Sequence, residues 1–159
     1  MRLKTVVLTL TVGLAFLGCN SCTDSPTPAE SSDPEIQTPT DPQNFKLIAL
    51  GDSYTIGQSV CESCRFPEQL KDSLQLRYTA LDTFNLEIIA QTGWTTTNLK
   101  SAISTAEPQT DFDLATLLIG VNNQYQNKPF ELYEIEFVEL VATAISLVGG
   151  DASKLIVVS

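Results

Sequence analysis

Gly51-Asp52-Ser53 follows directly on the apolar run 45–50 and presents a hydroxyl nucleophile. A serine that comes after a glycine turn at the carboxyl end of a strand lies on the rim of the sheet, where open α/β sheets bind their ligands. Ser53 could therefore attack a substrate. The alternative is an ordinary strand-to-loop turn, in which Asp52 and Ser53 hydrogen-bond their own backbone. On these residues alone the two interpretations are equally supported.

Hydrogen-bond donors occur at the ends of the next two predicted strands, in segments 92–94 and 120–123. Gly93 lets its backbone N–H approach a substrate closely, and Asn122 can direct a side-chain amide to the same place. Together with the N–H of Ser53, these groups make three donors for an oxyanion. Each residue alone is better explained as a turn residue. All three occur at successive strand ends, however, which favours an oxyanion hole.

The elements that must position these residues alternate between strand and helix. Strands are predicted at 45–50, 84–90, 114–119 and 155–158, as short aliphatic or β-branched runs typical of a parallel sheet. Three helices are predicted between them: the first is opened by Pro67, the second follows a threonine cap, and Gly149-Gly150 ends the third. This alternation predicts a three-layer α/β/α fold with right-handed crossovers.

The apolar faces of these helices have helical spacing and are predicted to be core. They comprise Phe66, Leu70 and Leu74 in the first helix, Leu99, Ala102, Ile103 and Ala106 in the second, and Phe130, Tyr133, Phe137, Leu140, Val141, Ala144, Ile145 and Val148 in the third.

The first 44 residues predict export and a tether. Residues 1–18 have a basic head and an apolar core too short to span the ~30 Å hydrocarbon layer, as in a signal peptide that is removed. Segment 16–19 resembles the lipobox of bacterial lipoproteins, which implies an exported, membrane-anchored protein lipidated at Cys19; a plain secretory signal is the alternative.

Residues 19–44 are rich in Pro, Thr and Ser and predict a disordered tether. Residues 45–159 suit one domain.

The net charge and the cysteine content limit which binding partners and which metal or disulfide sites are expected. Without the two basic residues of the signal, the chain carries 7 basic and 19 acidic residues, a net charge of about −12, which argues against nucleic acid and anionic lipid surfaces. Export permits a disulfide, and Cys61 and Cys64 are the nearest pair. A zinc site would need a second pair, so we predict a local staple beside Ser53 and no metal site. Cys22 would then be unpaired in the tether.

In pattern and order, these residues resemble the GDSL-type esterases, also called SGNH hydrolases. Segment 51–54 resembles the first block of that family, Gly93 the second, and Gly120-Val121-Asn122 the third. Asn123 stands where the family usually has Asp. The resemblance covers 45–159 and implies a nucleophilic Ser53 and oxyanion donors from Ser53, Gly93 and Asn122. It also implies hydrolysis of small or carbohydrate-linked acyl esters without metal or cofactor.

The fourth block of the family, Asp-x-x-His, has no counterpart, because the chain contains no histidine. The last predicted strand runs to the end of the sequence, so we expect a domain that is incomplete at its C-terminus. A neutral serine needs a base, so we expect this chain alone to be inactive.

Two other functions stay open. A non-catalytic surface lipoprotein could bind a glycan or a partner on the same scaffold, and the absence of histidine favours it. A flavodoxin-like module could bind an anion at turn 51–57, but it leaves Asn122 without a purpose.

Overall fold

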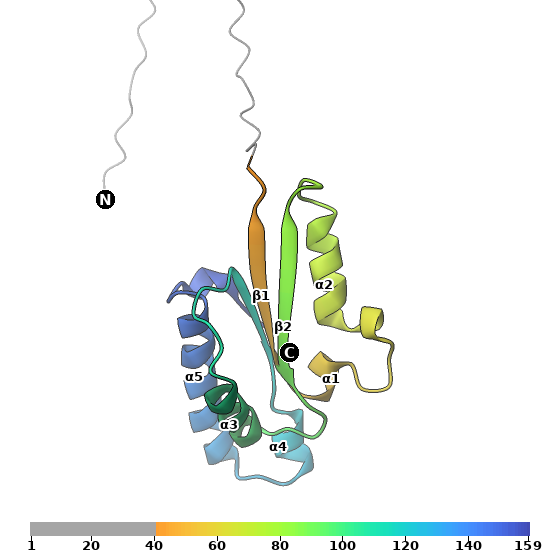
Figure 1. Ribbon diagram of the computed structural model, residues 1–159. Helices are drawn as coiled ribbons and strands as arrows, with labels where there is room; N and C mark the ends of the chain where they lie inside the picture. The colour runs from red at the N-terminus through yellow and green to blue at the C-terminus, as the bar shows by residue number, and fades with distance from the viewer. Residues whose placement is uncertain (1–40) are drawn as a thin grey trace, which may run out of the picture. The chain divides into compact units, whose positions relative to one another are not determined.

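Four parallel strands form the centre of the computed structural model, which describes residues 41–159 (Figure 1). They are β1 (Asn44–Gly51), β2 (Thr83–Ala90), β3 (Leu114–Leu118) and β4 (Leu155–Val157). Their order in the sheet is β2-β1-β3-β4, with Leu50 of β1 in register with Ile89 of β2 and Leu117 of β3. The predicted parallel α/β fold is therefore confirmed.

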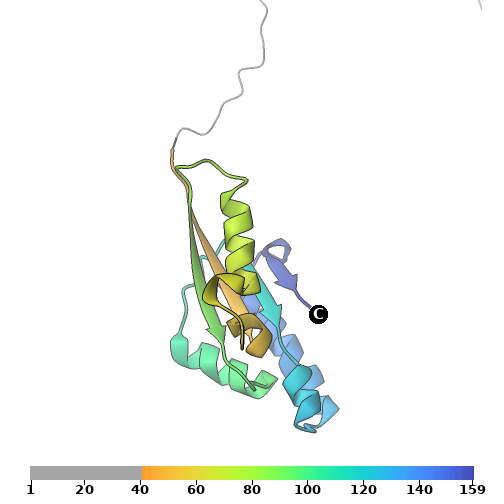
Figure 2. The ribbon, with the colours of Figure 1, turned by 90° about the vertical axis from the view of Figure 1, so that its right-hand side faces the viewer.

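Three long helices cover the two faces of this sheet: α2 (Phe66–Gln75), α3 (Thr96–Ala106) and α5 (Phe130–Leu147). Helix α2 lies on one face, and α3 and α5 lie on the other (Figures 1 and 2). Two short helices, α1 (Ser53–Ile56) and α4 (Val121–Tyr125), follow β1 and β3 directly. The sequence did not predict these two, because four or five residues are too few for a helical pattern. Two 3₁₀ turns, Glu62–Cys64 and Ala152–Lys154, complete the elements.

Helix boundaries have local causes that the sequence predicted. Pro67 lies in the first turn of α2, where its missing N–H costs nothing. Thr95 caps α3 and forms a reciprocal capping box with Asn98. Gly149 and Gly150 follow α5 with φ angles of 71° and 84°, a conformation that favours glycine.

Side chains of β1 alternate between the two helical layers, as the period of a strand requires. Leu47 and Ala49 lie against Pro67 and Leu70 of α2. On the opposite face, the main core combines residues of β1, β3, α3 and α5: Ile48, Leu50, Leu99, Ile103, Ala115, Leu117, Leu140 and Ala144. Both faces of the sheet are therefore buried in the middle, and its functional groups must lie at its ends.

Helix α5 departs from its predicted core stripe. Leu140 and Ala144 are buried, but Phe130 is 64 % exposed, whereas Glu136 is only 6 % exposed. Phe130 is the first residue of a helix that begins beyond the ends of the strands, so no strand lies beneath it (Figure 1). It stacks instead on Tyr133 with ring centroids 5.9 Å apart. Ala106 is also exposed, because it is the last residue of α3.

The predicted signal peptide, Cys19, Cys22 and nearly all of the tether lie outside the described residues. Strand β1 begins at Asn44, and the backbone N–H of Gln43 already donates to Asp82 Oδ1 at 2.9 Å. Among the helices of residues 41–159, none has the length and apolar character needed to cross a membrane.

Candidate active site

Gly51 lets the chain turn so that Ser53 lies at the edge of the sheet. A Cβ atom at this position would lie 2.1 Å from Thr55 Oγ1 and 2.5 Å from the backbone oxygen of Leu118, so only glycine fits. The absence of a side chain lets α1 pack directly against the ends of β1 and β3. The chain therefore turns at once, and Ser53 begins α1 as a half-buried residue.

Asp52 is fully buried at the start of α1. Its Oδ1 accepts the backbone N–H of Tyr54 at 3.0 Å and so caps the helix. Burial raises the pKa of the Asp52 carboxyl, and hydrogen bonds from the backbone N–H groups of Tyr54 and Asp52 oppose this shift only in part. The turn interpretation is thus correct for Asp52, while Ser53 Oγ makes no hydrogen bond to any residue within 41–159.

Gly93 occupies the third position of a turn that follows β2. The N–H of Trp94 donates to the carbonyl oxygen of Gln91 at 3.3 Å, and Gly93 has a φ angle of 83°, which together indicate a type II turn. No atom lies within 4 Å of the position that a Cβ of Gly93 would occupy. The backbone conformation, and not crowding, therefore requires glycine here.

Asn122 joins the other two segments. It lies on α4, after the end of β3, and its Nδ2 donates to the backbone oxygen of Trp94 at 2.9 Å. The same nitrogen lies 3.4 Å from Asp52 Oδ2, a long and weak contact. One N–H of this amide is therefore firmly held, and the other can be drawn to a substrate oxygen.

The three segments predicted from sequence thus meet at the carboxyl ends of β1, β2 and β3. Asn122 contacts the residue before Ser53 and the residue after Gly93. Such an arrangement, with donors from separate segments around a serine, can stabilise the negative charge that develops when a hydroxyl attacks a carbonyl.

A buried polar cluster behind these residues was not predicted. Asn123 Oδ1 accepts the N–H of Thr96 at 2.9 Å, and Asn123 Nδ2 donates to Thr96 Oγ1 at 2.7 Å. Thr96 Oγ1 lies 2.5 Å from Glu136 Oε2, and Thr97 Oγ1 lies 2.8 Å from both carboxyl oxygens of Glu136. Glu136 lies at helical spacing between Tyr133 and Leu140, which was the signal that it faces inward.

Two cavities adjoin the end of β3. The larger, about 760 Å³, is lined by Ile119, Gly120, Val121, Asn123, Gln124, Asn127, Lys128, Phe130 and Tyr133. The smaller, about 410 Å³, is lined by Tyr54, Leu118, Ile119, Val121, Val158 and Ser159. Val121, next to Asn122, borders both. Many of these side chains are apolar, so this end of the sheet can receive an apolar group of a ligand.

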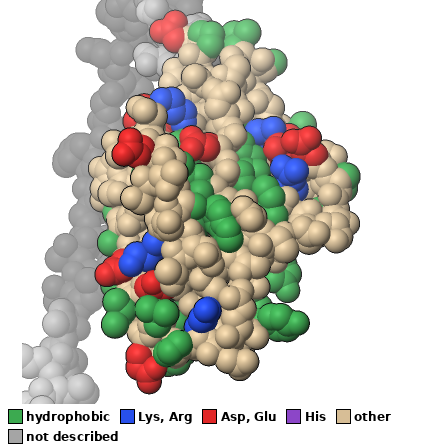
Figure 3. Space-filling model, turned by 60° about the horizontal axis from the view of Figure 1, so that its bottom comes forward, with side chains coloured by type: hydrophobic (Ala, Val, Ile, Leu, Met, Phe, Trp, Pro, Cys, Tyr) green, Lys and Arg blue, Asp and Glu red, His purple; other side chains and the backbone are tan. Residues whose placement is uncertain are grey.

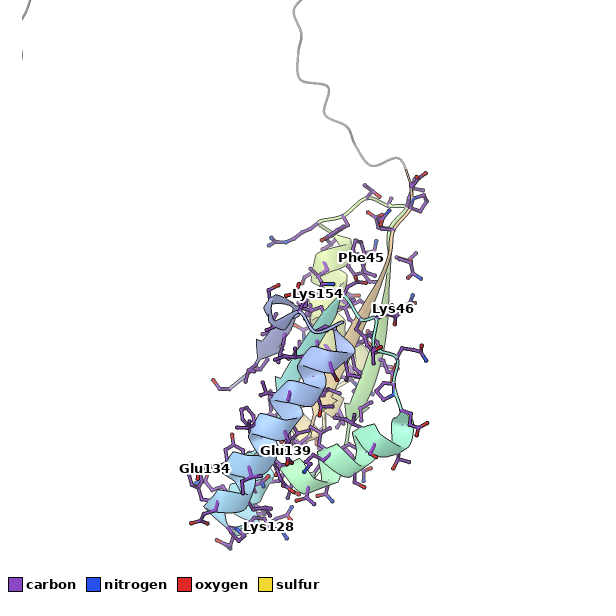
Figure 4. All side chains as sticks on the ribbon, turned by 90° about the vertical axis from the view of Figure 1, so that its left-hand side faces the viewer. Phe45, Lys46, Lys128, Glu134, Glu139 and Lys154 are labelled. Carbon is purple, nitrogen blue, oxygen red and sulfur yellow. A yellow bond between two sulfur atoms is a disulfide. The ribbon has the colours of Figure 1, made fainter. Side chains whose placement is uncertain are left out.

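Charged groups lie around this end of the molecule and not at its centre. In Figure 3, hydrophobic side chains are exposed in the middle of the face, with acidic and basic groups around them. Figure 4 shows Lys128 near the start of α5 and Glu139 on the side of α5 next to α3. There Glu139 binds Lys100 of α3.

The loop between α1 and α2 contains a disulfide that joins Cys61 to Cys64, with an S–S distance of 2.05 Å. Both residues are exposed. In residues 41–159, no group of three or more His, Cys, Asp or Glu side chains is arranged to hold a metal ion.

Comparison with known proteins identifies one family. The sequence model of the GDSL-like lipase/acylhydrolase family matches residues 49–158. No curated protein matches the chain.

Three solved structures have a similar fold. AlinE4, an SGNH-hydrolase family esterase, has a TM-score of 0.53 and 19 % identity over 65 % of this chain and 55 % of its own. TesA has a TM-score of 0.57 and 16 % identity over 70 % and 58 %. A member of the lipolytic protein G-D-S-L family from Veillonella parvula has a TM-score of 0.50 and 19 % identity over 71 % and 56 %.

Identities this low show the fold alone, and the chain spans between 55 % and 58 % of the length of these three structures. The family match covers most of the chain and contains all three segments that meet at Asn122. The chain therefore belongs to the GDSL-like lipase/acylhydrolase, or SGNH hydrolase, family.

Proposed function

We propose that this chain forms the nucleophile-bearing and oxyanion-binding part of a serine ester hydrolase that acts on small or carbohydrate-linked acyl esters. Ser53 is the nucleophile, and the oxyanion donors are the backbone N–H groups of Ser53 and Gly93 and the side-chain amide of Asn122. The observation that carries this proposal is the position of the Asn122 amide, which contacts both Asp52 and Trp94.

The reaction follows from these roles. Ser53 Oγ bonds to the ester carbonyl carbon, and the π electrons of the carbonyl move onto its oxygen, where the three donors stabilise the charge. The serine proton passes to a base, which returns it to the departing alcohol; water then releases the acyl group from Ser53 by the same route. Family membership supports this chemistry.

We propose that the base lies outside these 159 residues. The chain has no histidine. Asp52 is buried, and its two oxygens accept hydrogen bonds from Tyr54 and Asn122, so it is poorly placed to take the proton of Ser53. The match covers only 55 % of AlinE4 and 58 % of TesA, so both structures contain segments without a counterpart here, and we propose that the base lies in such a segment.

A second candidate is a non-catalytic protein that binds a glycan or a partner on this scaffold. The absence of histidine is the observation that favours it. In either case we propose an exported bacterial lipoprotein that is held at a membrane by a lipid on Cys19. The sequence of residues 1–19 supports this location.

Hydrolysis of a short-chain chromogenic ester tests the proposal. The 159-residue chain and the full-length product of its gene are compared, each with Ser53 or with Ser53→Ala. Only the full-length protein with Ser53 should exceed background. In that protein, Asn122→Ala should lower kcat by roughly 10²–10³-fold, or about 3–4 kcal/mol, and leave the fold intact.

Two results would contradict it. If the 159-residue chain hydrolyses the ester and loses this activity in Ser53→Ala, the base lies within the chain. If neither protein shows any activity that depends on Ser53, the non-catalytic binding protein is the better explanation.

A further inference from the structure

Three consecutive residues of the turn after β2 are held by side-chain amides from the other two segments of the site. Thr92 Oγ1 donates to Gln58 Oε1 at 2.5 Å, and Gln126 Nε2 donates to the backbone oxygen of Gly93 at 2.8 Å. Asn122 Nδ2 donates to the backbone oxygen of Trp94 at 2.9 Å. The turn is thus connected on both sides, to the segment after α1 and to α4.

Helix α4 and Gln126, the residue that caps its end, provide two of these bonds. Asn122 and Gln126 are four residues apart, which places their side chains one above the other. They bind successive carbonyl groups, of Trp94 and of Gly93 respectively. The backbone N–H of Gln126 also donates to the carbonyl of Asn122 at 3.0 Å, so Gln126 is itself held at the end of the helix.

The direction of the Gly93 N–H depends on the conformation of this turn. Types I and II differ mainly by a rotation of the peptide group between their second and third residues, here Thr92 and Gly93. Glycine has the largest conformational freedom of any residue, and no packing contact surrounds the Cβ position of Gly93. The Gly93 carbonyl belongs to the next peptide group, between Gly93 and Trp94, so a hydrogen bond to it fixes where the turn lies and not its type.

We propose that Gln126 is a positioning residue of the oxyanion hole. By holding the carbonyl of Gly93 against the end of α4, it fixes where the turn lies relative to Ser53 and Asn122, and so keeps the Gly93 N–H within reach of the oxyanion on the substrate of Ser53. Gln126 acts only through Gly93. This proposal rests on the proposed function of Ser53, Gly93 and Asn122.

The test uses Gln126→Glu and Gln126→Ala in the full-length protein. Glutamate has the shape of glutamine but cannot donate to the Gly93 carbonyl, and alanine removes the donor without adding charge. Gln91→Glu is the matched control, because Gln91 is an exposed residue at the start of the same turn whose side chain makes no hydrogen bond within residues 41–159. It adds the same charge two residues from Gly93.

Loss of one hydrogen bond of this kind is expected to lower kcat about fivefold to tenfold in both Gln126 variants. KM should change less than about twofold, because the oxyanion forms only in the transition state. The control should stay within about twofold of the parent in both constants. Trp94 is the only tryptophan of residues 1–159. Once any tryptophan beyond residue 159 is replaced by phenylalanine, the fluorescence reports on the turn. Acrylamide should quench it more strongly in the Gln126 variants than in the control.

The outcomes separate the two proposals. If Ser53→Ala abolishes hydrolysis but both Gln126 variants keep the kcat and the Trp94 quenching of the control, the positioning role is wrong and the proposed function stands. Equal losses in Gln126→Glu and Gln91→Glu would also overturn it, because charge alone would then explain the effect. If Ser53→Ala hydrolyses the ester like the parent, the proposed function fails and this role fails with it.

Discussion

Asn123 and Thr96 hold each other through two hydrogen bonds. The backbone N–H of Thr96 donates to Asn123 Oδ1 at 2.9 Å, and Asn123 Nδ2 donates to Thr96 Oγ1 at 2.7 Å. Thr96 Oγ1 accepts a hydrogen bond from Asn123 Nδ2, so its own hydroxyl hydrogen is directed to Glu136 Oε2, 2.5 Å away. The side-chain donors thus point in one direction, from Asn123 on α4 through Thr96 on α3 to the carboxyl group of Glu136 on α5.

Asn123→Asp should destabilise the protein, because it replaces the donor to Thr96 by a second carboxyl group in this buried cluster. We expect a loss of about 1–3 kcal/mol in the free energy of unfolding. In the Asn123→Asp/Glu136→Gln double variant, the cluster again has one carboxyl group and one amide, so part of this loss should be recovered. Urea unfolding of the parent, the Asn123→Asp and Glu136→Gln single variants and the double variant measures the coupling between the two sites. Losses that add to within about 0.5 kcal/mol would show that the two residues do not share a network.

Gly51→Ala and Gly93→Ala should have different effects. At Gly51 the new methyl group would meet the backbone oxygen of Leu118, which cannot move away alone. We therefore expect a loss of about 1–3 kcal/mol in the free energy of unfolding. At Gly93 there is open space, and the φ angle of 83° alone costs about 1–2 kcal/mol. Gly93→Ala should instead lower kcat, because the turn changes type and redirects the N–H at position 93.

Thermal unfolding and ester hydrolysis of the full-length protein distinguish the two glycines. A Gly93→Ala protein that keeps the parent kcat would remove the Gly93 N–H from the mechanism. A Gly51→Ala protein as stable as the parent would show that α1 is not packed against the sheet as described.

Asp52 and Asp82 should change stability with pH in opposite directions. Burial raises the pKa of Asp52 above its ordinary 3.8, so the folded state binds this proton more tightly than the unfolded state. Its contribution is greatest below pH 3.8 and is lost as pH rises through the folded pKa. Hydrogen bonds from the Gln43 N–H and from Thr79 lower the pKa of Asp82 below 3.8, so its contribution is present above that pH and is lost as pH falls through the folded pKa.

Unfolding free energies of the parent, Asp52→Asn and Asp82→Asn, measured from about pH 2 to about pH 7, test these signs. Relative to the parent, Asp52→Asn should gain stability as pH rises above 3.8. Asp82→Asn should lose stability relative to the parent as pH rises through the region below 3.8. Parallel curves for all three proteins would contradict both assignments.

Cys19→Ser should release the protein from membranes in a bacterial host, because the proposed lipid would have no sulfur to which it could be attached. Membrane fractionation and incorporation of radiolabelled fatty acid measure this directly. A Cys22→Ser variant is the matched control and should remain in the membrane fraction. Unchanged fractionation of Cys19→Ser, or fatty acid that still enters it, would mean that the signal is not of the lipoprotein kind.

The alternation of strands and long helices could be predicted from the sequence because each element carries its own pattern. The run that forms β1 is apolar at every position of 47–50, as a strand covered on both faces must be. Thr95, Pro67 and Gly149 mark helix ends through interactions within a few residues. The sequence alone also predicts that the segments of Ser53, Gly93 and Asn122 lie at one edge of the sheet, because parallel strands that follow one another in this way all end there.

Tertiary structure decided which groups meet at that edge. Asp52 and Asn122 are 70 residues apart, and no local pattern shows that their side chains touch. Glu136 was missed because an acidic residue on an apolar helix is usually solvated, whereas here two threonines at the start of α3 make its burial possible. Phe130 was placed in the core because helical spacing identifies a face but not where the sheet beneath it ends. Contacts between distant segments depend on how the layers pack, and only the folded chain determines them.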